Sequence, residues 1–250
     1  MAETVPESIA PPPENATFAI ILAAAGASSR FSHRGLNDPV AKKTFMHLDG
    51  KPVWLRSLEK FISRDDVAQL IIVVSPEDID WFRKYYLAEI NHLLLHVVPG
   101  GVTRMHSIRN GLVSVSSKVD FIAVHDAARP CVTDQEVSDV FAAAKQYGAA
   151  LLASPIIGTI KKVVDGQIEA TYPRNYFWEA QTPQVFRREM LIEAYQQQIT
   201  ASGADAPTDD AQLVERLGKP IHIVPTDRGN IKITTPADMV LAKHLVELGR

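Results

Sequence analysis

The chain of 250 residues contains a single cysteine, Cys131. One thiol cannot form an internal disulfide, and no cysteine-based metal site can be assembled from it. This composition fits a reducing, cytoplasmic setting. We expect Cys131 to be a half-buried and inert thiol.

Long apolar runs and a large excess of charge of one sign are also missing. No stretch of about 18 apolar residues occurs, so no membrane-spanning helix is expected. The net charge of −3 argues against a general nucleic-acid or membrane-surface binder. Residues 1–16 contain three consecutive prolines and no basic residue. They fit neither a signal peptide nor a transit peptide, and we expect a disordered tail there.

Several catalytic signatures are absent. The first apolar run is followed by only one glycine, Gly26, where a dinucleotide fingerprint needs three. No Gly-Lys-Ser/Thr of a P-loop, no His-Glu-x-x-His zinc motif and no Gly-x-Ser-x-Gly elbow occurs. His92 and His96 fall in an expected strand, and we interpret them as surface residues.

Short apolar runs that alternate with amphipathic stretches predict the fold. Buried strands are expected over residues 18–25, 70–75, 93–98, 121–125 and 149–154. Helices are expected to begin at Ser75-Pro76, at the capping box Thr133-x-x-Glu136, and at Thr235-Pro236. This alternation predicts an α/β fold with a doubly wound, mostly parallel, Rossmann-like sheet in one domain over residues 17–250.

Residues 157–174 break that rhythm, because they alternate apolar and polar residues around Asp165-Gly166, a strong hairpin signal. We expect a projecting hairpin arm, within residues 156–180, whose apolar face packs on a second copy of the chain. The alternative is a hairpin folded flat on its own domain.

Ligands of open parallel sheets bind at the carboxyl ends of the strands. The small residues Ala24, Ala25 and Gly26 follow the first strand, and Arg30, Lys42 and Lys43 come after them. Gly101, Val102, Arg104 and Ser107 follow the third strand, and Asp126 and Arg129 follow the fourth. Lys232 is expected in a short apolar strand, where it needs an anion, either Asp126 or a ligand phosphate. Many cations and few nucleophile–base pairs favour phosphoryl or nucleotidyl transfer.

These stretches together resemble the 2-C-methyl-D-erythritol 4-phosphate cytidylyltransferase family of the non-mevalonate isoprenoid pathway. The matching strings are "AAAGASSRF", "KKTFMHLDGKPV", "GGVTRMHSIRNGL", "HDAARP", "WEAQTPQVF", "TDDAQLVERLG" and "NIKITTPADM". They occur in the family's order between Phe18 and Met239. "HDAARP" and "QTPQ" with the following Phe186 are the most specific of them.

The resemblance implies roles for individual residues. Ala24, Ala25, Gly26 and Arg30 would cradle CTP; Gly101, Val102 and Ser107 would read cytosine, with Arg104 beside them. The family's loop lysine falls on Lys43, and Arg30, Lys43 and Lys232 would be the catalytic cations. Asp126, Arg129, Thr159 and Thr182 would bind the acceptor, and Arg174 would reach the acceptor phosphate of the other subunit of a homodimer.

The implied reaction is attack by the acceptor's phosphomonoester oxygen on the α-phosphorus of CTP, with Mg²⁺ held mainly by the CTP phosphates. Three departures from the family pattern are Ser28 in place of glycine, Val102 and His106 each in place of aspartate. The loop before Lys43 is also longer than usual. Alternatives are a ribitol-5-phosphate cytidylyltransferase, a non-catalytic CTP-binding relative and an NAD-dependent reductase.

Overall fold

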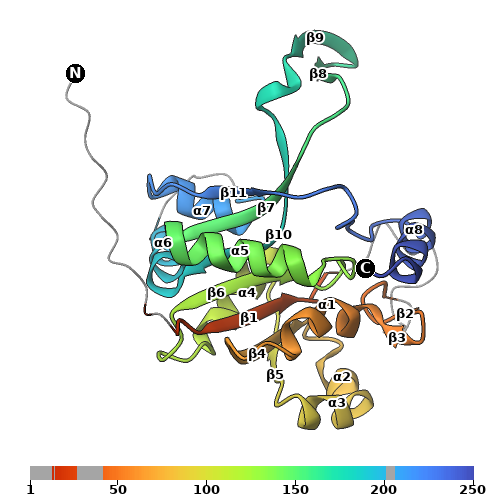
Figure 1. Ribbon diagram of the computed structural model, residues 1–250, viewed down its shortest axis with the longest axis vertical. Coiled ribbons are helices and arrows are strands. Elements are labelled where there is room, and N and C mark those ends of the chain that lie inside the picture. The colour runs from red at the N-terminus through yellow and green to blue at the C-terminus, as the bar shows by residue number, and fades with distance from the viewer. Residues whose placement is uncertain (1–12, 14, 27–41, 201–205) are drawn as a thin grey trace.

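The central element of the computed structural model is a seven-stranded sheet (Figure 1). The structure describes residues 13, 15–26, 42–200 and 206–250. The sheet order is β11-β7-β10-β6-β1-β4-β5, and only β10 runs antiparallel to its neighbours. The strands are β1 (Phe18–Ala23), β4 (Val67–Val74), β5 (His96–Pro99), β6 (Phe121–Asp126), β7 (Ala149–Pro155), β10 (Trp178–Arg187) and β11 (His222–Pro225). The predicted doubly wound, mostly parallel sheet is confirmed.

Helices cover both faces of this sheet. They are α1 (Val53–Ile62), α2 (Ile79–Tyr85), α3 (Leu87–His92), α4 (Arg104–Val113), α5 (Asp134–Tyr147), α6 (Arg188–Thr200), α7 (Asp210–Arg216) and α8 (Pro236–Glu247). Alternate residues of a strand point to opposite faces, so β1 supplies two separate cores. Its residues Ile20 and Leu22 pack with α1 and α5, whereas Ile21 packs with α4, α6 and α7.

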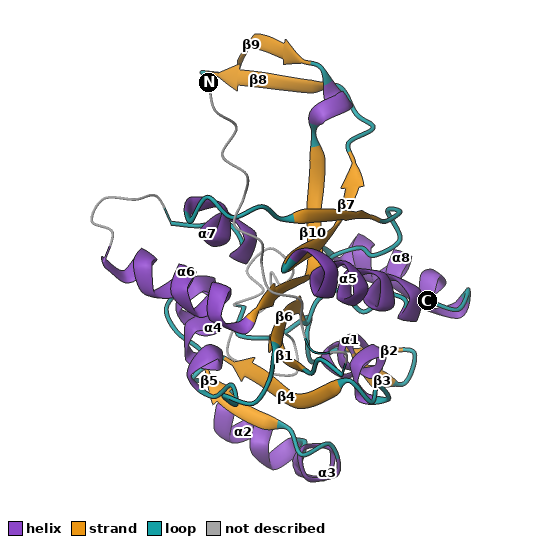
Figure 2. Cartoon of the chain, turned by 60° about the vertical axis from the view of Figure 1, so that its left-hand side comes forward, coloured by secondary structure: helices purple, strands orange, loops and turns teal. Residues whose placement is uncertain are grey.

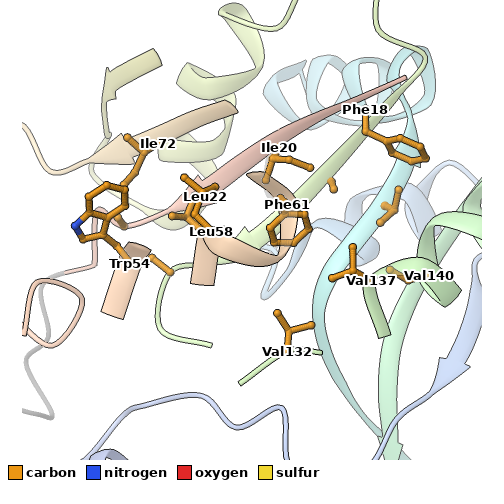
Figure 3. Close-up of a cluster of buried hydrophobic side chains, with 14 of the residues drawn as sticks. Phe18, Ile20, Leu22, Trp54, Leu58, Phe61, Ile72, Val132, Val137 and Val140 are labelled. Atoms are coloured by element: carbon orange, nitrogen blue, oxygen red, sulfur yellow. The ribbon is translucent and has the colours of Figure 1, made fainter. Parts of the chain in front are cut away.

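Figure 3 shows the first of these cores, where α1 lays Trp54, Leu58 and Phe61 against β1 and Ile72 of β4. The three α1 side chains are fully buried. Burial of each such side chain contributes roughly 1.5–3 kcal/mol relative to exposure. The core thereby fixes the carboxyl ends of β1, β4 and β6 relative to one another.

The predicted capping box at Thr133 and the predicted helix start at Thr235-Pro236 are both confirmed. Thr133 accepts a hydrogen bond from the Glu136 N–H at the start of α5, and Thr235 accepts one from the Asp238 N–H at the start of α8. The predicted start at Ser75-Pro76 is wrong, because α2 begins only at Ile79. The Ser75 hydroxyl donates to Asp78 Oδ2, 2.5 Å away, and residues 76–78 form a turn.

The expected hairpin is present and stands away from the sheet (Figures 1 and 2). Its strands are β8 (Ile160–Val164) and β9 (Gln167–Tyr172), followed by the short 3-10 helix η2 (Arg174–Tyr176). Asp165 and Gly166 both have positive φ, 49° and 77°, as a tight two-residue turn requires. A small second hairpin pairs β2 (His47–Leu48) with β3 (Lys51–Pro52).

Three local predictions are corrected. Cys131 is fully buried rather than half-buried, because α8 covers it and its thiol lies 3.8 Å from the Ala242 carbonyl. His92 ends helix α3 and is not in a strand, although both His92 and His96 are exposed. Lys232 lies in an irregular segment between β11 and α8. No helix among the residues described is long and apolar enough to cross a membrane.

Candidate active site

The loop after β5 packs closely on the end of β1. A Cβ atom added to Gly100 would lie 2.6 Å from the Ala25 Cβ and 3.1 Å from the Ser107 Oγ, so only glycine fits here. The Gly101 N–H donates to the Ser107 hydroxyl over 3.0 Å, and Thr103 caps helix α4. Ala25, the Gly100–Gly101 turn and Ser107 therefore pack closely together at the carboxyl edge of the sheet.

Asp126, the last residue of β6, is the centre of a charged cluster at the same edge. Its Oδ2 lies 2.5 Å from the Lys232 ammonium, and its Oδ1 lies 3.5 Å from Nε of Arg104. The Lys232 segment is held against the β6 end by a hydrogen bond from the Ile233 N–H to the Ala128 carbonyl. The sequence left two possible anionic partners for Lys232, Asp126 and a ligand phosphate. In the structure, Lys232 contacts Asp126.

The cluster fixes the charge of its members. Burial alone would raise the pKa of the Asp126 carboxyl, but Arg104 and Lys232 more than offset this and hold that pKa well below its usual range. Burial would lower the pKa of Arg104, yet the Asp210 and Asp126 carboxylates raise it. Asp126 is therefore ionised and Arg104 is cationic throughout the physiological pH range.

A buried hydrogen-bond network supports Asp126 from behind. The Asp126 N–H donates to the Thr182 hydroxyl over 3.0 Å, and Thr182 also contacts Nδ1 of His125 at 3.1 Å. Nε2 of His125 lies 3.1 Å from the Arg129 carbonyl. The carbonyl can only accept, so Nε2 carries the proton and Nδ1 accepts from Thr182. Burial lowers the pKa of His125 to about 4, against a smaller opposing effect of Asp126.

A pocket of about 350 Å³ opens beside this cluster. Its lining is polar and contains three cationic side chains. The lining residues are Arg129, Glu179, Gln181, Arg228, Asn230, Ile231, Lys232 and Thr234. The Arg129 guanidinium donates to the Asn230 carbonyl over 2.7 Å, and the Asn230 amide donates to the Thr182 carbonyl over 2.9 Å. The pocket can therefore hold an anionic, hydroxyl-rich molecule next to Asp126.

The two neighbouring lysines before β2 have different environments. The Lys42 side chain is buried, with its ammonium 2.5 Å from Asp78 Oδ2 and 3.3 Å from the Ser75 hydroxyl. Lys43 is half-buried. The charge of Lys42 is thus neutralised within the protein, so it serves the packing of this segment.

The sequence model of the 2-C-methyl-D-erythritol 4-phosphate cytidylyltransferase family matches residues 18–248 of the chain. The protein belongs to this family. A cytidylyltransferase of this name from Rhodopirellula baltica is 37% identical over 242 residues, which cover 92% of this chain and 95% of that protein.

Solved structures of the family have the same fold. The Francisella tularensis 2-C-methyl-D-erythritol 4-phosphate cytidylyltransferase superposes with a TM-score of 0.77 at 28% identity, covering 92% of this chain and 100% of that one. The Thermus thermophilus enzyme of the same name gives 0.72 at 29% identity, covering 91% and 98%. The likeness extends over nearly the whole chain.

The structure brings most residues implied by the family resemblance to one sheet edge. Hydrogen bonds and ion pairs connect Arg104, Asp126, Thr182 and Lys232 directly, and link Arg129 to them through Asn230. Val102 is 91% exposed, so its side chain makes little contact. Arg30 and Ser28 lie outside the described residues.

Thr159 and Arg174 are not part of this cluster within one chain. Both lie on the segment that carries the hairpin, apart from the sheet (Figure 2). The Arg174 guanidinium donates to the carbonyl of Ile157. Either residue could therefore act only at the Asp126 cluster of a second copy of the chain.

Sequence reasoning missed three supports of the site. Asp210 pairs with Arg104, and Gln181 and Asn230 line the pocket. The stretches "TDDAQLVERLG", "QTPQ" and "NIKITTPADM" contain all three, so the family match marked their segments. Gln181 contacts Ser154 from 27 residues away, Asn230 contacts Thr182 from 48, and Asp210 pairs with the still more distant Arg104, so no local spacing could indicate these contacts.

Proposed function

We propose that the protein transfers CMP from CTP to 2-C-methyl-D-erythritol 4-phosphate, releasing pyrophosphate and forming 4-diphosphocytidyl-2-C-methyl-D-erythritol. Family membership over residues 18–248 supports the activity. The observation that carries the site assignment is the Lys232–Asp126–Arg104 cluster beside the Gly101–Ser107 turn. It provides fixed cations and a fixed carboxylate where the strands end.

In this mechanism, a phosphate oxygen of the acceptor attacks the α-phosphorus of CTP, and the bond from that phosphorus to the bridging oxygen of pyrophosphate breaks. The second pKa of a phosphomonoester is about 6, so the attacking oxygen is already anionic at pH 7. No general base is needed. Arg30, Lys43 and Lys232 would stabilise the negative charge that develops on the α-phosphate and the leaving group.

The nucleotide and the acceptor would occupy adjacent parts of the sheet edge. Ala24, Ala25 and Gly26 would lie under the phosphates, and the Gly101–Ser107 turn would contact cytosine through its backbone. The pocket beside Lys232 would take the acceptor's hydroxyls, with Asp126, Arg129 and Thr182 around it. Ground-state binding there would place the acceptor phosphate in line with the α-phosphorus.

Magnesium fits this site only as a partner of the nucleotide. No group of three or more His, Cys, Asp or Glu residues suited to a metal occurs in the part of the chain that the structure describes. Asp126 is the carboxylate at the centre of the cluster, and both its oxygens face cations. Mg²⁺ held by the triphosphate oxygens would neutralise charge on CTP.

The hairpin arm supports a homodimer as the working form. Its exposed apolar side chains include Ile157, Val163, Val164, Ile168 and Tyr176. A two-stranded hairpin is marginal alone, and this one has only its partner strand within the described chain. A second copy would cover the arm and would bring Thr159 and Arg174 toward its Asp126 cluster. The buried Cys131 thiol is compatible with a cytoplasmic location.

The test is pyrophosphate release from CTP and Mg²⁺, with methylerythritol 4-phosphate and ribitol 5-phosphate supplied in separate reactions. Release with the first acceptor alone is the expected result. Release with ribitol 5-phosphate alone would keep the mechanism and replace the acceptor. CTP binding without release from either acceptor would indicate a non-catalytic relative, and binding of NAD in place of CTP would overturn the proposal.

A further inference from the structure

We propose that Asp210 is a positioning residue for the nucleotide site and that it acts through Arg104, with Tyr195 as its support. The inference rests on the proposed function, because it assumes that the Gly101–Ser107 turn and Arg104 face CTP. It goes beyond that function by assigning two residues on α6 and α7 to nucleotide binding.

The observation behind it is a chain of alternating charges that runs from the protein interior to the sheet edge. The Asp210 carboxylate has no exposed surface. Its Oδ2 lies 2.7 Å from Nη2 of Arg104, and its Oδ1 accepts a hydrogen bond of 2.5 Å from the Tyr195 hydroxyl. Arg104 then approaches Asp126, which pairs with Lys232. The order is Tyr195, Asp210, Arg104, Asp126, Lys232.

Asp210 is held more firmly than the arginine that it contacts. It is the first residue of α7, where the Asp209 side chain accepts from the Gln212 N–H. Gln184 of β10 connects this helix start to the sheet. Its side-chain NH₂ donates to Asp209 over 2.8 Å, and its side-chain oxygen accepts from the Ala211 N–H over 3.0 Å. The Arg104 side chain, by contrast, is 30% exposed. The fixed carboxylate therefore orients the guanidinium.

A carboxylate is needed because both of its oxygens face donors. Tyr195 donates a hydrogen bond to one oxygen, and the Arg104 guanidinium forms an ion pair with the other over 2.7 Å. An asparagine at position 210 would turn its NH₂ group toward one of these donors and lose that contact. Hydrogen bonds to charged groups contribute about 1.5–3 kcal/mol, which corresponds to a roughly 10- to 100-fold change in affinity.

Arg104 has a second acidic partner, and this determines the consequence of losing Asp210. Its Nε lies 3.5 Å from Asp126 Oδ1, farther than its 2.7 Å contact with Asp210. Without Asp210, the guanidinium would close on Asp126 and compete with Lys232 for that carboxylate. The cation beside the Gly101–Ser107 turn would then be displaced from the nucleotide.

The test measures the dissociation constant of CTP with Mg²⁺ by calorimetry for wild type, Asp210→Asn, Tyr195→Phe, Arg104→Met and the two double variants that contain Arg104→Met. We expect Asp210→Asn to weaken CTP binding about 10- to 100-fold and Tyr195→Phe to weaken it less. In the Arg104→Met background, neither change should alter CTP affinity more than about 2-fold, since a residue that acts through Arg104 has no effect once Arg104 is gone.

A purely structural role predicts a different result. Asp210→Asn would then lower the unfolding temperature and leave CTP affinity unchanged, or its effect would add to that of Arg104→Met. Either result overturns the inference. Asp139→Asn, on the exposed surface of α5, is the matched control and should change nothing. If Asp210→Asn does not fold, the double-mutant cycle of Tyr195→Phe with Arg104→Met provides the same test. A wild-type protein that binds no CTP would refute the proposed function itself.

Discussion

The Lys42 ammonium lies 2.5 Å from Oδ2 of Asp78, and both side chains are buried. Lys43, the next residue, is half-buried. Two adjacent lysines thus differ in environment, one neutralised inside the protein and the other nearer to solvent. The structure thus gives Lys42 a structural role, and the proposed catalytic role of Lys43 is tested separately.

Replacing Lys42 by Met should destabilise the fold. The change leaves Asp78 buried without its cation, and removal of one partner of a buried ion pair typically costs about 3–5 kcal/mol. Chemical unfolding by urea measures this loss. The double variant Lys42→Met, Asp78→Asn should recover part of it, because no buried charge is then left alone. An unchanged unfolding midpoint for Lys42→Met would contradict the structural role.

Replacing Lys43 by Ala should leave the free energy of unfolding, measured in urea, within about 0.5 kcal/mol of wild type, as for most changes outside a core. It should lower kcat/KM for pyrophosphate release about 10²- to 10³-fold if its ammonium stabilises the α-phosphate in the transition state. Steady-state kinetics with varied CTP provide the measurement. Equal kinetic losses in the folded Lys42 and Lys43 variants would refute the assignment to Lys43.

Gly100→Ala should weaken CTP binding, because the new methyl group would lie 2.6 Å from the Ala25 Cβ and would force the β1 loop and the β5 turn apart. We expect about a 10-fold rise in the dissociation constant, on the order of the 1–3 kcal/mol that overpacking costs. Gly158→Ala is the control, since a Cβ there would meet nothing within 4 Å. If both variants bind CTP like wild type, the close contact does not shape the site.

His125 should make stability depend on pH. Burial lowers its pKa to about 4 in the folded protein, against about 6.5 in the unfolded chain. The unfolded state therefore binds more protons between these values, and stability falls as pH falls. The free energy of unfolding should drop by roughly 2 kcal/mol from this group between pH 7.5 and 5.0. His125→Gln should remove that dependence, whereas the exposed His244→Gln should retain it.

The arm should be needed for dimerisation. Ile168 of β9 is 65% exposed, and replacing it by Asp would place a charge on the apolar face that a second copy is proposed to cover. Light scattering after gel filtration should show a monomer and a fall in kcat/KM. Val113→Asp, 85% exposed on α4, tests whether any added surface charge has this effect. A wild-type chain that is already monomeric would remove the arm's proposed role.

Local sequence signals predicted the elements whose cause is local. The capping box at Thr133, the helix start at Thr235-Pro236 and the Asp165-Gly166 turn depend on residues within four positions of each other, and all are present. The helix start predicted at Ser75-Pro76 was wrong. Ser75 and Asp78 instead form one cluster with Lys42, which lies 33 residues before Ser75. A capping pattern cannot reveal such competition.

Without the family resemblance, the candidate site was predictable as a set of strand ends and a lysine that needs an anion. Parallel topology brings Asp126 and the Gly101–Ser107 turn to one edge, so their proximity follows from the fold class. The position of the antiparallel strand β10 does not follow from that topology. This strand nevertheless supplies Thr182, which contacts Asp126, and Gln184, which holds the start of α7. The Arg104–Asp210 pair spans 106 residues and depends on how α7 packs. These tertiary contacts come from packing rather than from any periodicity.

Strand β10 also makes a mechanical connection between the hairpin and the charged cluster. Residues Trp178–Ala180 pair with β7 near the arm, and Gln184–Arg187 pair with β6 in the middle of the sheet. Thr182 lies between these two paired stretches and holds the backbone of Asp126. One continuous strand therefore joins the arm to the charged cluster, and its pairing with β7 is interrupted between Ala180 and Gln184, where Thr182 contacts Asp126. In the proposed dimer, a displacement of the arm would reach the Asp126 backbone through this irregular stretch.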